Sequence, residues 1–169
     1  LAVPVFRVED TDGEALDYQS LELPPLPLLD VAKAWGVDVA PVAYQGGWLG
    51  YFRPDTNEIR LATPEEKTFF HELSHKAHQL ITGKLQPGQN WHQEIVAELS
   101  AQALCHIVGS DPGRTVGNSY DYICHYAQKA GKEPIQAILS VIRDIEKVMA
   151  AILVESSVQT PYPTAPARS

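Results

Sequence analysis

The segment His71-Glu72-Leu73-Ser74-His75 has the residue types and the spacing of a metal-dependent hydrolytic site. Histidines at positions i and i+4 lie on one side of an α-helix, about one turn apart, so both imidazoles can bind the same ion. A chain of this composition contains only about 0.015 such HExxH segments by chance. Zinc accepts imidazole and carboxylate ligands, and a catalytic zinc site has three protein ligands and one open position. The segment therefore predicts Zn2+ bound by His71 and His75.

Glu72 is expected to act beside the ion rather than on it, because it points about 100° around the helix from His71. A carboxylate in this place can serve as general base, taking a proton from the water that the metal acidifies and passing it to the leaving amine. His78 also falls on the ligand side, but it lies about 10 Å from His71 along a straight helix axis. We therefore expect the third ligand to come from another segment, and we expect His78 and His92 to border the cleft or to be solvated.

The stretch Gln93-Glu94-Ile95-Val96-Ala97-Glu98 carries two carboxylates at positions i and i+4, which share one face of a helix. The connection before it is long enough to turn this helix back against the first. We predict Glu94 as the third zinc ligand. Glu98 would accept the other ring N–H of a ligand histidine and so fix the tautomer of that ring. The opposite assignment, with Glu98 on zinc, stays open.

The rest of the chain predicts an α+β domain that positions these helices. Helical spacing, glycine stops and β-like runs separated by turn residues predict helices and strands in order along the chain. The expected helices cover residues 27–35, 64–82, 91–108, 119–130 and 134–153, and the expected strands cover 39–44, 48–53 and 58–62. We expect a small antiparallel three-stranded sheet packed on the HExxH helix, with the Glu-bearing helix and two further C-terminal helices. Residues 1–25 are predicted to be a linker or arm, residues 26–154 the domain, and residues 155–169 a disordered tail.

Composition excludes several classes of protein. The 169 residues have a formal net charge of −8, which is the wrong sign for neutralising a phosphate backbone, so nucleic-acid binding through this segment is disfavoured. The longest apolar run is too short to span a bilayer, which predicts no membrane segment. Two cysteines cannot form a disulfide framework, and no secretory signal is visible. We expect a cytoplasmic protein, and the start at Leu1 suggests a fragment or a processed product.

Several stretches together resemble the metallopeptidase domain of ArdC-type antirestriction proteins, which is related to the gluzincin-like ImmA/IrrE group. The resemblance covers roughly residues 27–153, about three quarters of the chain. It is carried by Val31-Ala-Lys-Ala-Trp-Gly-Val, Gly50-Tyr51-Phe52, Glu58-Ile-Arg-Leu61, His71-Glu-Leu-Ser-His75, Glu94-Ile-Val-Ala-Glu98-Leu99 and Gly117-Asn-Ser-Tyr-Asp-Tyr-Ile123. It implies a zincin-like fold and a zinc-dependent endopeptidase of intracellular proteins, encoded by a plasmid or an integrative element. ImmA/IrrE relatives often carry Asn where Glu98 stands, so the role of Glu98 is the least transferable.

Two further parts of the site follow from the resemblance. In such folds an edge strand pairs with extended substrate, and residues Trp48, Leu49, Gly50 and Tyr51 are the expected strand because glycine lets another backbone approach; an ordinary hairpin is the alternative. Tyr122 is the expected catalytic donor to the oxyanion, with core packing as the alternative.

The sequence thus leads to two hypotheses of function. The first is a zinc metallopeptidase that hydrolyses peptide bonds in an intracellular protein. The second is a zinc-holding antirestriction module that acts by binding DNA or a protein without proteolysis. ArdC-type proteins usually carry a single-stranded-DNA-binding domain before the peptidase domain, and contact with nucleic acid would then come from that domain.

Overall fold

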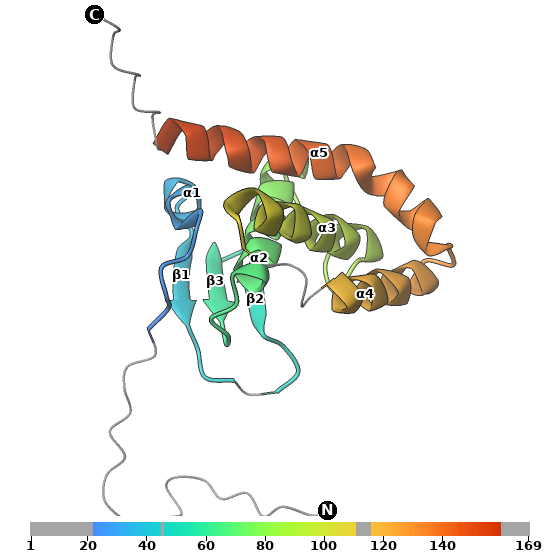
Figure 1. The fold of residues 1–169 in the computed structure, drawn as a ribbon, viewed down its shortest axis with the longest axis horizontal. Helices are drawn as coiled ribbons and strands as arrows, with labels where there is room; N and C mark the ends of the chain where they lie inside the picture. Colours follow the sequence, from blue (N-terminus) through green and yellow to red (C-terminus); the bar gives the residue numbers. More distant parts are fainter. Residues whose placement is uncertain (1–21, 45, 111–115, 160–169) are drawn as a thin grey trace, which may run out of the picture.

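A computed structural model describes residues 22–44, 46–110 and 116–159 of the chain. Figure 1 shows an α+β fold in which a small sheet lies beside a group of helices. The elements follow in the order α1 (Leu29–Ala34), β1 (Asp38–Pro41), β2 (Gly50–Arg53), β3 (Glu58–Leu61), α2 (Glu66–Thr82), α3 (Trp91–Val108), α4 (Val116–Lys129) and α5 (Pro134–Gln159). The α+β class and the order of elements agree with the sequence-based expectation.

The sheet is mixed, so the prediction of an antiparallel three-stranded sheet was wrong. Its strand order is β1-β3-β2, with β1 parallel to β3 and β2 antiparallel to β3. The turn at residues 54–57 forms the expected hairpin between β2 and β3. The longer connection between β1 and β2 carries the chain past the position of β3 instead of folding it directly back. Strand β2 therefore lies at one edge of the sheet.

Helices α2 and α3 end at glycines. Gly83 and Gly109 have φ angles of 77° and 80°, and they terminate α2 and α3 in the left-handed conformation that glycine adopts without a steric penalty. Helix α5 continues to Gln159, so residues 155–159, predicted to belong to a disordered tail, are helical. Residues 1–21 and 160–169, which hold most of the predicted arm and tail, lie outside the described residues.

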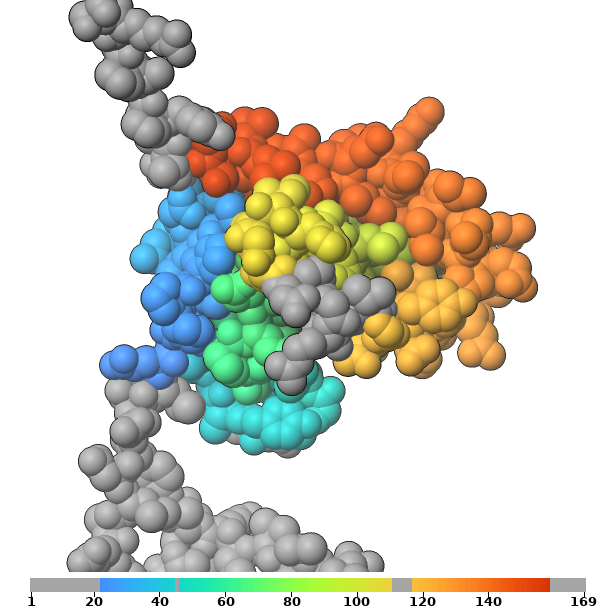
Figure 2. Space-filling view, viewed as in Figure 1, coloured from blue at the N-terminus to red at the C-terminus, as the bar shows by residue number. Residues whose placement is uncertain are grey.

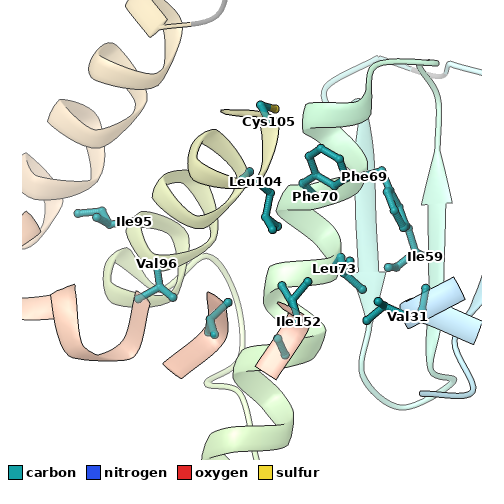
Figure 3. Packing of buried hydrophobic residues seen from close by; sticks show 14 of the residues in the cluster. Val31, Ile59, Phe69, Phe70, Leu73, Ile95, Val96, Leu104, Cys105 and Ile152 are labelled. Atoms are coloured by element: carbon teal, nitrogen blue, oxygen red, sulfur yellow. The ribbon is translucent and has the colours of Figure 1, made fainter. Parts of the chain in front are cut away.

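The core lies between the sheet and the helices and has α2 at its centre (Figure 3). Phe69 and Leu73 of α2 and Ile59 of β3 are fully buried, as are Leu104 of α3 and Ile152 of α5. Because α2 is packed on several sides, the side chains of its remaining face have a fixed position. This rigidity matters because the HExxH residues belong to that helix.

Helix α5 (orange to red) runs along the top of the molecule in the view of Figure 2. It contacts α1, α2, α3 and α4. The indole Nε1–H of Trp35, at the end of α1, donates to Oε2 of Glu155, near the end of α5, over 3.3 Å. This hydrogen bond joins α1 to α5. Within the described ranges, no helix is long and apolar enough to cross a membrane.

Candidate metal centre

The polar seam between α2 and α3 brings the predicted ligands together. The two helices contact each other along their length, and their side chains pair in opposite order along the chain. Lys67 and His71 of α2 meet Glu98 of α3, and His75, one turn further along α2, meets Glu94, one turn earlier on α3. The connection after Gly83 therefore returns α3 antiparallel to α2, as the sequence suggested.

His71, His75 and Glu94 converge on one point with the spacing of a tetrahedral metal site. His71 Nε2 and His75 Nε2 lie 3.2 Å apart, and Glu94 Oε2 lies 3.5 Å from the first and 3.8 Å from the second. Zinc–ligand bonds of about 2.0–2.1 Å at tetrahedral angles separate neighbouring ligand atoms by about 3.4 Å. The observed distances surround that value, so these groups are placed to hold a metal ion.

Glu98 lies on the other side of the His71 ring. Nδ1–H of His71 donates to Glu98 Oε2 over 3.2 Å, which leaves Nε2 as the ring atom that faces Glu94. The second oxygen of Glu98 pairs with Lys67 Nζ at 2.6 Å. This geometry favours Glu94 over Glu98 as the third ligand, and it gives Glu98 a partner that holds its position.

Lys67 was not among the residues singled out from the sequence. Its signal was present, because residues 67, 71 and 75 follow the i, i+4, i+8 pattern of one helix face. A lysine next to a carboxylate cannot be distinguished from a solvated surface pair until the facing helix is placed. Here the Glu98 carboxylate is buried, with a side-chain exposure of 6%, so the ammonium group of Lys67 compensates an enclosed charge.

The protonation of these groups is set by the close contact between imidazoles and carboxylates. Burial alone lowers the pKa of His71, but hydrogen bonds to Glu94 and Glu98 outweigh burial and raise that pKa to about 10. Burial raises the pKa of Glu98, yet its contacts with His71 and Lys67 outweigh burial and hold that pKa at about 2. Burial and the adjacent His71 lower the pKa of His75 to about 3. The carboxylates thus favour positive charge at this point, as a cation site requires.

Glu72 belongs to α2, and its side chain faces the edge strand β2. It is 7% exposed, and burial raises the pKa of its carboxyl group to about 7, against the opposing effect of His71. The backbone N–H of Phe52 in β2 donates to this carboxylate. Glu72 is thus fixed beside the ligands in a form that exchanges a proton near neutral pH.

The free edge of β2 faces the same region. The N–H of Ala62 donates to the carbonyl of Leu49 over 2.7 Å, and in the antiparallel alternation the backbone polar groups of Gly50 and Phe52 therefore point away from β3. The bond from Phe52 to Glu72 agrees with this direction. The expected edge strand is therefore at the site, although Trp48 and Leu49 precede the regular strand.

The structure gives a different reason for glycine at position 50 from the one expected. A Cβ atom at this position would lie 2.7 Å from Cγ2 of Thr68 in α2 and 3.3 Å from the carbonyl oxygen of Arg60. The absence of a side chain thus allows the sheet to pack closely on α2. The approach of another chain to this strand depends on the backbone direction of β2 rather than on this glycine.

A cleft of about 980 Å3 lies over the three candidate ligands, His71, His75 and Glu94. Residues 47–52 line one part of it, and residues 84–89, between α2 and α3, line another. Trp48 and Leu49 are 37% and 48% exposed at this cleft. The site is therefore open to a large ligand and carries apolar side chains beside its polar centre.

Tyr122 of α4 reaches the centre of the cleft. Its hydroxyl donates to Glu94 Oε2 over 2.5 Å, and its ring meets the ring of His71 edge to face at 5.8 Å. Burial and the Glu94 carboxylate raise the pKa of Tyr122 far above its usual value, so the hydroxyl keeps its proton. The structure thus places Tyr122 at the site, with its hydroxyl on the ligand oxygen.

Gln93 is a second residue that the sequence analysis did not identify. Its side-chain Oε1 accepts from the backbone N–H of Gln86 over 2.6 Å, and its Nε2 donates to the carbonyl of Gln86 over 3.2 Å. This pair of bonds attaches the segment that lines the cleft to the start of α3. The sequence signal was a polar residue beside Glu94, which became informative only when Gln93 proved to be 7% exposed.

The position of His78 differs from the expectation, whereas the His92 side chain is 31% exposed and keeps contact with solvent. Neither is among the described residues that line the cleft. His78 is 3% exposed, so its interpretation as a solvated residue was wrong, because α5 covers this part of α2. The two rings lie 5.8 Å apart, centre to centre, near Asp144 of α5.

Comparisons with protein-family models, with curated proteins and with solved structures found no match to this chain. The resemblance noted from the sequence therefore rests on the motifs quoted above.

Proposed function

We propose that this protein is a zinc-dependent metallopeptidase, with His71, His75 and Glu94 as zinc ligands and Glu72 as general base. The observation that carries the proposal is the convergence of the three ligand atoms within 3.2 to 3.8 Å, next to a buried carboxyl group that is not a ligand. Two imidazoles and one carboxylate form a ligand set typical of catalytic zinc sites. When bound, zinc would acidify water and polarise the carbonyl of a peptide bond.

Glu72 supports this reaction through its proton affinity and its fixed position. A pKa of about 7 allows its carboxylate to accept a proton from water and to return it to the leaving nitrogen of the peptide. The bond from the N–H of Phe52 keeps the carboxylate oriented toward the cleft. Both proton transfers therefore use one side chain that does not need to move between environments.

The cleft supports a peptide as substrate. An extended chain could pair with the backbone groups of Gly50 on the free edge of β2, which would place its next peptide bonds near the ligands. Trp48 and Leu49 supply exposed apolar surface for its side chains. A hydroxyl donor, Tyr122, lies 2.5 Å from Glu94 and can serve the oxyanion if it turns from that carboxylate.

The test compares Glu72→Gln with the wild type after both are loaded with zinc. Cleavage of fluorescein-labelled casein and of a mixed peptide library, followed by mass spectrometry, gives the activity. We expect Glu72→Gln to bind zinc like the wild type and to lose roughly 10²–10⁴-fold in rate, because the general base is removed. Glu65→Gln is the matched control, since Glu65 is exposed at the same cleft and the charge change is identical.

The proposal would be wrong if the wild type, carrying one equivalent of zinc, cleaved none of these substrates, or if Glu72→Gln cleaved them as fast as the wild type. A normal rate for Glu65→Gln beside a lost rate for Glu72→Gln would assign the effect to the buried carboxyl group rather than to the loss of one negative charge.

A further inference from the structure

A second group of metal-binding side chains lies outside the cleft, where α2, α3 and α5 meet. It consists of His78 from α2, His92 from α3 and Asp144 from α5, and one ligand atom of each lies within 4.8 Å of the other two. His92 Nε2 is 3.2 Å from Asp144 Oδ2, and the rings of His78 and His92 are tilted by 34°. Two of these residues come from consecutive helices, and Asp144 comes from a helix much further along the chain.

His78 gives the main evidence that this group binds a ligand. It is 3% exposed, and its Nδ1 has no hydrogen-bond partner among the residues that the structure describes. A buried ring nitrogen without a partner is uncommon, because its lost hydration is not replaced. A cation held between His78, His92 and Asp144 would give this buried imidazole a partner, because the lone pair of a ring nitrogen is a metal ligand.

Asp144 can serve this group without losing its other contact. Its Oδ1 pairs with Lys147 Nζ at 3.1 Å, whereas Oδ2 is the oxygen that faces His92. Lys147 is 58% exposed, so its ammonium group can also move into solvent. One carboxylate oxygen thus remains directed at the two imidazoles.

We propose that His78, His92 and Asp144 form a second metal site, which takes zinc or another divalent transition metal and cross-links α5 to the α2–α3 pair. Two imidazoles and a carboxylate suit such ions, whereas magnesium and calcium prefer oxygen ligands. The side chains of His92 and Asp144 are 31% and 26% exposed, which leaves a coordination position open to water. The ligand atoms are spread more widely than those of the first site, so we expect weaker binding here.

The experiment counts zinc ions bound to the full chain by native mass spectrometry, after removal of metal with a chelator and titration with Zn2+. We expect two ions on the wild type and one on each of the variants Asp144→Asn and His92→Asn. Glu146→Gln and His106→Asn are the matched controls, because these residues are exposed on the same two helices, and both should bind two ions. If Asp144→Asn and His92→Asn bind as many ions as the wild type, the proposal is overturned.

The two sites are separated with Glu94→Ala, which removes a ligand of the first site only. This variant should keep one ion, and combining it with Asp144→Asn should remove that ion. If the first site does not bind zinc, Glu94→Ala will leave the ion count unchanged while Asp144→Asn lowers it, which contradicts the metallopeptidase proposal and supports this one.

A stability measurement on the Glu94→Ala chain gives an independent readout. Zinc at one hundred times its dissociation constant should lower the equilibrium constant of unfolding in urea about 100-fold, because the ion binds only the folded chain. The effect should vanish when Asp144→Asn is added. Loss of both ions from both single-site variants, Asp144→Asn and His92→Asn, would refute an independent second site.

Discussion

At the scale of single residues, Glu94 and Glu98 lie on one face of α3 but make different contacts with the histidines of α2. Glu94 Oε2 lies near both His71 Nε2 and His75 Nε2, whereas Glu98 accepts from the opposite nitrogen of His71. The helical spacing that places both glutamates on one face does not distinguish their roles. Their distances to Nε2 and Nδ1 of His71 distinguish them.

Alanine substitutions can test this division of roles. We expect Glu98→Ala to weaken zinc binding roughly 10–100-fold, as the loss of a residue that orients a ligand does, and Glu94→Ala to weaken it more, because a ligand itself is lost. Competition with a chromogenic chelator measures both constants, with Asp144→Asn present in every protein so that the second cluster does not contribute. A larger effect for Glu98→Ala would make Glu98 the third ligand.

Tyr122 combines a contact to Glu94 with a position at the cleft. We expect Tyr122→Phe to lower the rate of peptide cleavage by about 10²-fold, as loss of an oxyanion donor does. Zinc affinity should fall only about 10-fold, because Glu94 loses one hydrogen bond but keeps its place. Steady-state kinetics and a zinc titration separate the two effects, and Tyr120→Phe, at an exposed position on the same helix, is the control. An unchanged rate would limit Tyr122 to packing.

At the scale of elements, the contact between β2 and α2 positions the edge strand against the site. Gly50→Ala should cost about 1–3 kcal/mol of unfolding free energy, because its Cβ would lie 2.7 Å from Cγ2 of Thr68. Urea denaturation measures the loss, and Gly117→Ala, whose Cβ would meet no atom within 4 Å, should leave stability unchanged or raise it by up to about 1 kcal/mol.

A second substitution makes this prediction specific. Thr68→Ser removes the Cγ2 atom, so the double variant Gly50→Ala with Thr68→Ser should recover part of the lost stability. Equal losses with and without Thr68→Ser would show that the contact with α2 is not the reason for glycine at this position.

At the scale of the whole molecule, α5 holds the helices that carry the site. Ile152 of α5 is fully buried against the core, and Val154, two residues further along the same helix, is 63% exposed. We expect Ile152→Ala to lower the free energy of unfolding by about 2–5 kcal/mol, through lost burial and a residual cavity. Val154→Ala should change it by no more than about 0.5 kcal/mol. Thermal and urea unfolding check both, and similar values for the two variants would contradict the role of α5 as a packed element.

Sequence periodicity predicted much of this protein because some of its information is local. Helix geometry places His71 with His75 and Glu94 with Glu98 on shared faces, whatever the rest of the chain does. Glycines at helix ends also act locally, and Gly83 and Gly109 end α2 and α3 as expected. The ligand pairs and the helix boundaries near them could thus be derived from neighbouring residues alone.

Other features depended on contacts between distant segments, which local patterns do not specify. The pairing of β1 with β3 follows from the path of a long connection, and a turn signal does not show on which side of a strand that connection returns. The role of Gly50 depends on Thr68, and the cluster of His78, His92 and Asp144 depends on where α5 packs. Helical geometry alone placed the candidate ligands of the first site on two helix faces. The second group of candidate ligands came together only through the packing of three helices.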